Sequence, residues 1–160
     1  MKKNGFTLVE LIAVIVIISI ISMLAAPNIV DLMQRSKDGS FISEVDQLVS
    51  QARYMYKNNN TRPDPEEDGS VKIYMSNLTG DVPTSDPYGY DYDMTNSYVS
   101  FEENCPADSM CTLDTKVHIV SCKKDKVDAA GSNVCHCIYK TLNNYDKEIT
   151  KDDISGDCGS

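Results

Sequence analysis

The chain has 160 residues, which suits a single domain of ordinary size. It carries 24 acidic and 15 basic side chains, a net charge of −9, and residues 61–160 alone hold 19 acidic and 9 basic residues. Because such a surface repels phosphate groups, the charge argues against direct nucleic-acid binding by this part of the chain, and its simplest role is solubility.

A short basic start and a long apolar run form the first thirty residues. Lys2 and Lys3 precede Gly5, and residues 11–30 contain no charged side chain. At about 1.5 Å per residue, a helix of this length spans about 30 Å, enough to cross a bilayer. Glu10 stands at the edge of the run, and the cost of a charge in apolar surroundings marks it as a functional residue.

This segment resembles the prepilin signal of type IV pilins and pseudopilins, through Lys2-Lys3-Asn4-Gly5, Phe6-Thr7-Leu8-Val9-Glu10-Leu11 and the apolar run behind them. The resemblance covers about residues 1–58. It implies that a prepilin peptidase cleaves between Gly5 and Phe6 and that Phe6 is then N-methylated. It also implies that Glu10, Phe6 and Pro27 serve filament assembly, with Pro27 kinking the helix.

A secretory signal peptide and a simple membrane anchor are the alternatives for this segment. A cut after Ala26 would place Leu24 where a small residue is expected and Pro27 just behind the cut, and the run exceeds the usual ~7–15-residue signal core. An anchor explains the lysines but neither Gly5-Phe6 nor Glu10. The positive-inside rule predicts that Lys2 and Lys3 stay cytoplasmic, so the rest of the chain faces outward.

Residues 31–60 predict an amphipathic second half of the same helix. Apolar residues recur there every three or four positions, at Phe41, Ile42, Val45, Leu48, Val49, Ala52, Met55 and Tyr56. Gly39 predicts a bend or a break. Asn58-Asn59-Asn60, followed by Pro63 and Pro65, predicts the end of the helix.

The remaining residues, 61–160, predict a small antiparallel sheet. Strands are expected at 71–75, 98–101, 115–122 and 134–139, and strands so close in sequence favour a meander. Residues 123–133 are predicted to be a turn, and the polar tail from Asn143 to be held only through Cys158. The predicted fold class is α+β, with a leader at 1–5, an apolar helix at 6–30, an amphipathic helix at 31–60 and a head at 61–160.

Six cysteines lie in the last 56 residues, at Cys105, Cys111, Cys122, Cys135, Cys137 and Cys158. An even number in one region behind an export signal predicts disulfides formed in an oxidising compartment. Zinc sites usually contain two cysteines separated by two to four residues, and no such pair occurs here. Six cysteines allow 15 connectivities, and the spacing does not choose among them.

Two acidic stretches are weak calcium candidates. Asp64, Glu66 and Asp68 alternate before Gly69 like the start of an EF-hand loop, but the last ligand position falls on Met75. Asp86-Pro87-Tyr88-Gly89-Tyr90-Asp91-Tyr92-Asp93 is similar to the Asp-Pro-Trp-Gly-Asn-Pro-Tyr loop common in major pseudopilins. Asp91 and Asp93 could help to bind a cation, although a structural role for this loop is favoured. No other cofactor is expected.

The chain contains no motif for catalysis, and His118 and His136 lie on expected strands, so no enzyme is predicted. The resemblance implies a structural subunit of an extracellular type IV pilus-like filament, used in adhesion, motility or surface interaction. Its implied partners are other pilin subunits, the prepilin peptidase, the membrane before assembly, and the assembly platform. The alternatives are a pseudopilin of a type II secretion or DNA-uptake machine, a minor tip pilin or adhesin, and a monomeric membrane-tethered domain.

Overall fold

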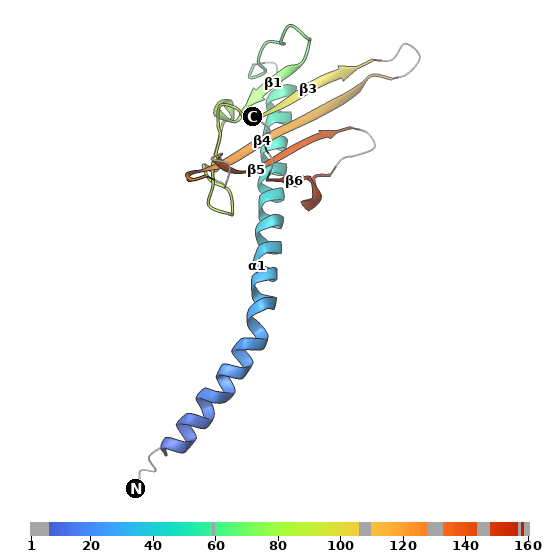
Figure 1. Cartoon of the computed structure of the whole chain (residues 1–160). Helices are drawn as coiled ribbons and strands as arrows, with labels where there is room; N and C mark the ends of the chain where they lie inside the picture. Colours follow the sequence, from blue (N-terminus) through green and yellow to red (C-terminus); the bar gives the residue numbers. More distant parts are fainter. Residues whose placement is uncertain are drawn as a thin grey trace, which may run out of the picture. The chain divides into compact units, whose positions relative to one another are not determined.

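A computed structural model describes residues 7–58, 60–105, 110–127, 133–143, 148–156 and 158 of the chain. The chain divides into two compact units, the first unit Met1–Ser36 and the second unit Lys37–Ser160. The helix α1 begins at Leu8 and ends at Lys57, and the sheet belongs to the second unit (Figure 1).

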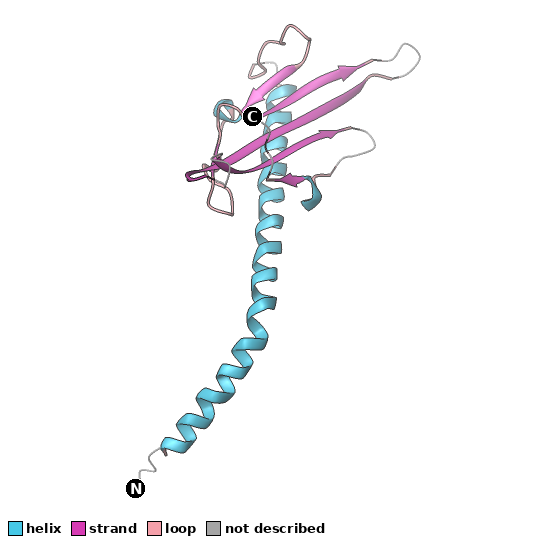
Figure 2. Cartoon of the chain, viewed as in Figure 1, coloured by secondary structure: helices cyan, strands magenta, loops and turns pink. Residues whose placement is uncertain are grey.

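The sheet is antiparallel, with the strand order β1-β3-β4-β5-β6; the strands are labelled in Figure 1 and drawn in magenta in Figure 2. Its members are β1 (Val71–Tyr74), β2 (Asp91–Tyr92), β3 (Tyr98–Asn104), β4 (Thr112–Val127), β5 (Asn133–Leu142) and β6 (Ile154–Ser155). The short strand β2 pairs with β4 at Ser121 and Cys122, just beyond His118, where the pairing of β3 with β4 ends. Two short 3-10 helices, η1 (Met75–Asn77) and η2 (Lys151–Asp153), complete the described elements. The predicted α+β class and the β3-β4-β5 meander are therefore confirmed.

The core of the second unit lies between the sheet and the part of α1 that crosses it (Figure 1). Phe41, Val45 and Ala52 on the helix are 0% exposed. They belong to one cluster with apolar residues of the strands, namely Val71, Ile73, Val99, Phe101, Val117, Ile119 and Ile138. This burial confirms the amphipathic face predicted from residue spacing, and α1 ends directly before Asn58, as the asparagine and proline residues predict.

Of the two outcomes predicted at Gly39, the break is wrong, because α1 is continuous through this residue, and the bend stays a prediction. A glycine inside a helix costs about 1 kcal/mol relative to alanine, a small amount beside the burial of a large side chain. Phe41 is fully buried two residues later, and the packing of this face holds the backbone in the helix.

The turn predicted at residues 123–133 is too long. β4 continues to Val127 and β5 begins at Asn133, and these two residues pair after a shift of register that begins at Lys123. The prediction used apolar alternation as the strand signal, and the polar residues after Cys122 lack it. Backbone hydrogen bonds between the two strands of a hairpin need no apolar side chains. The pairing of β4 with β5 therefore extends past Cys122, beyond the residues that pack in the core.

The tail is held by more than Cys158, which corrects the sequence prediction. Ile149 is buried in the core, and β6 pairs with β5 through Ile154 opposite Ile138. The Lys140 Nζ atom lies 2.9 Å from an Asp153 carboxylate oxygen. Single apolar and charged residues in a polar segment give no periodic signal, so sequence spacing alone could not reveal these contacts.

Three disulfides join the cysteines in sequence order, and they bridge Cys105 to Cys111, Cys122 to Cys135, and Cys137 to Cys158. The second bridge links directly opposite positions of β4 and β5, with the two Cα atoms 4.1 Å apart. The third attaches the tail to the fully buried Cys137 of β5. The connectivity that the sequence left open is thus decided by the strand register and by the position of the tail.

Candidate functional site

The first unit exposes an unusually large set of apolar side chains. Each of the following has 46% or more of its surface exposed in the single chain: Leu8, Val9, Leu11, Ile12, Val14, Ile15, Val16, Ile17, Ile18, Ile20, Ile21, Met23, Ile29, Val30, Leu32 and Met33. Exposed apolar surface on this scale is a mark of a protein or membrane contact. This set of exposed apolar side chains is the principal candidate surface for contacts with lipid or with other copies of the chain.

Glu10 and Thr7 form a reciprocal hydrogen-bonded cap at the start of α1. The backbone N–H and the hydroxyl of Thr7 donate to the Glu10 carboxylate at 2.9 and 3.0 Å, and the Glu10 N–H donates to the Thr7 hydroxyl oxygen at 3.2 Å. This is a capping box. The sequence analysis marked Glu10 as a functional charge at the edge of the apolar run but missed this partner, although Thr-x-x-Glu before an apolar run is its recognisable signal.

Gly5 and Phe6, the expected cleavage and methylation site, lie outside the described residues. Pro27 lies within the bounds of α1, but its side chain is outside the described set, and the expected kink stays a prediction. In the described portion of the chain, no helix combines the length and the apolar character needed to cross a membrane.

Asp86 is a buried charged residue of the second unit, and only 5% of its surface is exposed. Its carboxylate accepts hydrogen bonds from the backbone N–H groups of Tyr88 and Tyr90, at 2.9 and 2.8 Å, and from the Ser121 hydroxyl at 2.5 Å. Burial opposes ionisation, but these bonds and the nearby His136 ring outweigh it and hold the pKa of Asp86 below its usual range.

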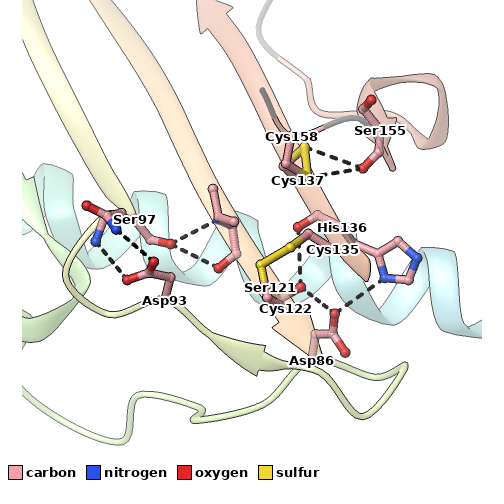
Figure 3. Close-up of a disulfide and its surroundings, with 12 residues drawn as sticks. Asp86, Asp93, Ser97, Ser121, Cys122, Cys135, His136, Cys137, Ser155 and Cys158 are labelled. Atoms are coloured by element: carbon pink, nitrogen blue, oxygen red, sulfur yellow. Dashed lines mark hydrogen bonds and ion pairs between the residues drawn. A yellow bond between two sulfur atoms is a disulfide. The ribbon is translucent and has the colours of Figure 1, made fainter. Parts of the chain in front are cut away.

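His136 lies between the loop and the sheet, where two tyrosine rings contact it. Its Nδ1 atom is 3.7 Å from the Asp86 carboxylate and has no closer hydrogen-bond partner among the described residues (Figure 3). The Tyr90 ring stacks on the imidazole with centroids 4.5 Å apart, and the Tyr88 ring is 4.3 Å away. Both histidines lie on strands as predicted, and this arrangement makes His136 a packing residue of the loop.

Two tyrosines of the same loop attach it to α1. The Tyr88 hydroxyl donates to the Asp38 carboxylate, and the Tyr92 hydroxyl donates to Glu44 at 2.9 Å. The pKa values of Tyr88 and Tyr92 are raised above the usual range, mainly because the two hydroxyls are buried and further because each donates to a carboxylate. Both rings also contact Phe41, so the loop closes over the start of the helix-sheet core.

The weak calcium candidates are not gathered into one site. In the parts of the chain that the structure describes, no group of three or more His, Cys, Asp or Glu residues is placed to hold a metal ion. Asp68 instead accepts hydrogen bonds from the N–H and hydroxyl of Ser70. Asp93 accepts from Thr95 and Asn96, and Asp91 lies on β2. The structural role predicted for the Asp86 loop agrees with its contacts.

Comparison with known proteins identifies the N-terminal segment. Residues 1–26 match the family model of the prokaryotic N-terminal methylation motif. The chain is 28% identical to type II secretion system core protein G of Pectobacterium carotovorum subsp. carotovorum over an alignment 107 residues long, and the match covers 59% of this chain and 68% of that protein. It is 27% identical to the protein of the same name from Dickeya chrysanthemi, covering 59% and 69%. No solved structure matches the chain.

These matches, together with the fold, confirm the resemblance to type IV pilins and pseudopilins. The long helix packed on an antiparallel sheet and the disulfides of the second unit are those of a pilin-like α+β protein. Both named relatives are proteins of type II secretion systems.

We expect Asp86→Asn to destabilise the second unit, because the amide offers one acceptor oxygen where the carboxylate now receives three hydrogen bonds. Loss of a buried charged acceptor usually costs about 1–3 kcal/mol of unfolding free energy. The measurement is denaturant unfolding followed by near-ultraviolet circular dichroism. Asp81→Asn, at an exposed residue, is the matched control and should leave the unfolding free energy unchanged.

The stability difference between the wild type and Asp86→Asn should depend on pH, and the lowered pKa of Asp86 gives the sign. A carboxyl whose folded pKa is lowered adds stability above its unfolded pKa of about 3.9, and this stability is lost as pH falls through the folded pKa. Acidification below about pH 4 should therefore destabilise the wild type more than Asp86→Asn. Equal acid sensitivity of the two would contradict the role given to this carboxylate.

Proposed function

We propose that this chain is a structural subunit of a pilin-like filament, of the pseudopilin kind that serves protein secretion. The observation that carries the proposal is the extent of the match to type II secretion system core protein G, which covers 59% of the chain. Residues 1–26 alone match the methylation motif, so the resemblance to that protein extends well into the second unit. This favours the secretion alternative over the extracellular pilus that the N-terminal signal by itself implied.

Assembly in this proposal depends on the exposed apolar side chains of the first unit. Before assembly, residues 6–30 hold the subunit in the membrane, with Lys2 and Lys3 on the cytoplasmic side. An apolar helix leaves lipid at little cost if it enters a bundle of equally apolar helices. The filament core is then made of these helices, and the disulfide-bonded second units cover the outside. The prepilin peptidase and an assembly platform are the partners that this route requires.

Glu10 has two roles in the proposed sequence of events. In the single chain its carboxylate caps α1 through Thr7. Cleavage after Gly5 creates a new amine at Phe6, and in the filament this amine on a neighbouring subunit pairs with Glu10. A carboxylate left unpaired in a helical bundle would cost several kcal/mol or take up a proton. The pair therefore sets the axial position of each added subunit.

Processing is tested on the protein isolated from cells. We expect mass spectrometry to show a chain that begins at N-methylated Phe6. Gly5→Val should block the cut, because the residue before the cleaved bond is then β-branched, and the precursor should stay in the membrane. A mature N-terminus at or after Ala26 would instead identify a secretory signal peptide.

The role of Glu10 is tested with a pair of variants that separate charge from capping. Glu10→Gln keeps the capping box, in which glutamine also serves, but removes the charge. Thr7→Ala keeps the charge and removes the cap, at a helix cost of about 1 kcal/mol. We expect Glu10→Gln to stop filament growth after normal cleavage, and Thr7→Ala to permit it, as counted by electron microscopy. Normal filaments in Glu10→Gln would show that the carboxylate charge has no role in assembly.

The choice between secretion and the other functions is tested by deleting the gene in its own host. We expect loss of export of specific proteins while motility, adhesion and DNA uptake stay normal. Complementation with the wild-type gene should restore export, and complementation with the Gly5→Val variant should not. Unchanged export together with loss of sheared surface filaments would indicate a type IV pilus subunit, and loss of adhesion with filaments intact would indicate a tip pilin.

A further inference from the structure

A hollow of about 310 Å³ lies between the last turns of α1 and the strands β4 and β5. Its lining combines two exposed cations of the helix, Arg53 and Lys57, with a largely buried floor. The floor includes Tyr56, Thr115 and Leu142, which are 8%, 1% and 3% exposed. A hollow with an apolar floor and a cationic rim suits a ligand that presents an apolar group between carboxylates.

The two rim cations belong to a chain in which cations are scarce. Without Met1–Gly5, 13 basic residues remain against 24 acidic ones, a net charge of −11. Arg53 and Lys57 lie four residues apart and so share one face of the helix. Arg53 interacts electrostatically with Asp46, yet across the described ranges neither rim cation makes an ion pair. Lys57 lies in the last turn of α1, where a positive charge interacts favourably with the helix dipole. Arg53 lies one turn earlier, so the dipole does not account for its position.

The loop before β1 has the opposite character. Residues 64–67, the acidic loop, are Asp64, Pro65, Glu66 and Glu67, and all four are exposed. Hydrogen bonds close the turn that follows, because the Glu66 N–H donates to the Ser70 carbonyl at 2.7 Å and the Asp68 carboxylate accepts from Ser70. Glu66 and Glu67 thus lie on a hydrogen-bonded turn, next to the exposed Pro65.

None of the residues of the acidic loop lines the hollow, although Tyr56 of its floor also lines a neighbouring pocket with Asp68 and Gly69. The acidic loop leads into β1, the edge strand of the order β1-β3-β4-β5-β6, whereas the hollow is lined by β4 and β5. A protein that carries two different, mutually complementary patches can bind copies of itself head to tail. Contacts of this kind generate open helical arrays unless the rotation closes a ring.

We propose that the acidic loop of one copy docks in the Arg53-Lys57 hollow of the next copy. Pro65 covers the apolar floor, and the carboxylates of Asp64, Glu66 and Glu67 meet the cationic rim. This contact rests on the proposed filament function and adds to it a specific lateral interface between the second units. Exposed ion pairs contribute little stability, so the contact chiefly sets register and selects the partner, while the apolar helices hold the filament together.

The test uses the full-length chain in assembled filaments made from mixed ¹⁴N- and ¹⁵N-labelled subunits. A carbodiimide joins a lysine amine to a carboxylate only where the two groups touch. We expect peptides that link Lys57 of one label to Glu66 or Glu67 of the other. Arg53→Glu should lower the yield of this link about three- to tenfold, because it places a like charge beside the incoming loop. Arg53→Lys should preserve the yield.

A charge exchange provides the second arm. Glu66→Arg alone should lower the Lys57–Glu67 link, and combining it with Arg53→Glu should restore the link. Lys151→Glu, at an exposed residue of η2 that does not line the hollow, is the matched control and should leave the yield unchanged. The wild-type yield should also fall between about 0.05 and 0.5 M salt, because the Debye length shortens to a few ångströms.

The outcomes separate this contact from the function on which it rests. Filaments that form without any link from Lys57 to the acidic loop of another copy would overturn the contact and leave the filament function standing. A Lys57 link between identically labelled peptides only would assign the loop to its own hollow, which also overturns the contact. A wild-type chain that never self-associates after cleavage would overturn both.

Discussion

The burial of one face of α1 against the sheet is the contact on which the second unit depends. Phe41, Val45 and Ala52 lose all contact with water, and the strands contribute Val99 and Ile119 to the same cluster. A sheet with one apolar face needs a second layer to cover it, and in the described structure this helix is that layer. Burial at about 25 cal/mol per Å² of apolar surface outweighs a glycine in the helix, which is why α1 does not break at Gly39.

The Asp86 loop adds a polar attachment to this apolar layer. A buried carboxylate is tolerated only when donors surround it, and here two donors belong to the loop itself and the third to β4. These bonds favour the conformation in which Tyr88 and Tyr92 reach Asp38 and Glu44 on the helix. Helix, loop and strand are held together by one network, next to the disulfide between β4 and β5 (Figure 3).

The two units differ in what they need from other molecules. The second unit has its own core and three disulfides, whereas the apolar side chains that the structure describes in the first unit are exposed. Surface of this kind is stable only against lipid or against other helices. In the proposed filament, self-association follows from this apolar composition, and the proposed contacts of Glu10 and of the Arg53-Lys57 hollow set its direction and register.

Some features of this protein follow from short stretches of sequence. The N-terminal signal, the amphipathic period from Phe41 to Tyr56, the end of α1 and the meander depend on residue type and spacing within a few positions, so the sequence determined them. Other features depend on residues far apart in the chain. Ser121 reaches Asp86 across 35 positions, and Cys122 meets Cys135 because the β4-β5 register places them opposite each other. Only the tertiary structure decided these contacts, because register and long-range packing are properties of the assembled sheet and not of any local pattern.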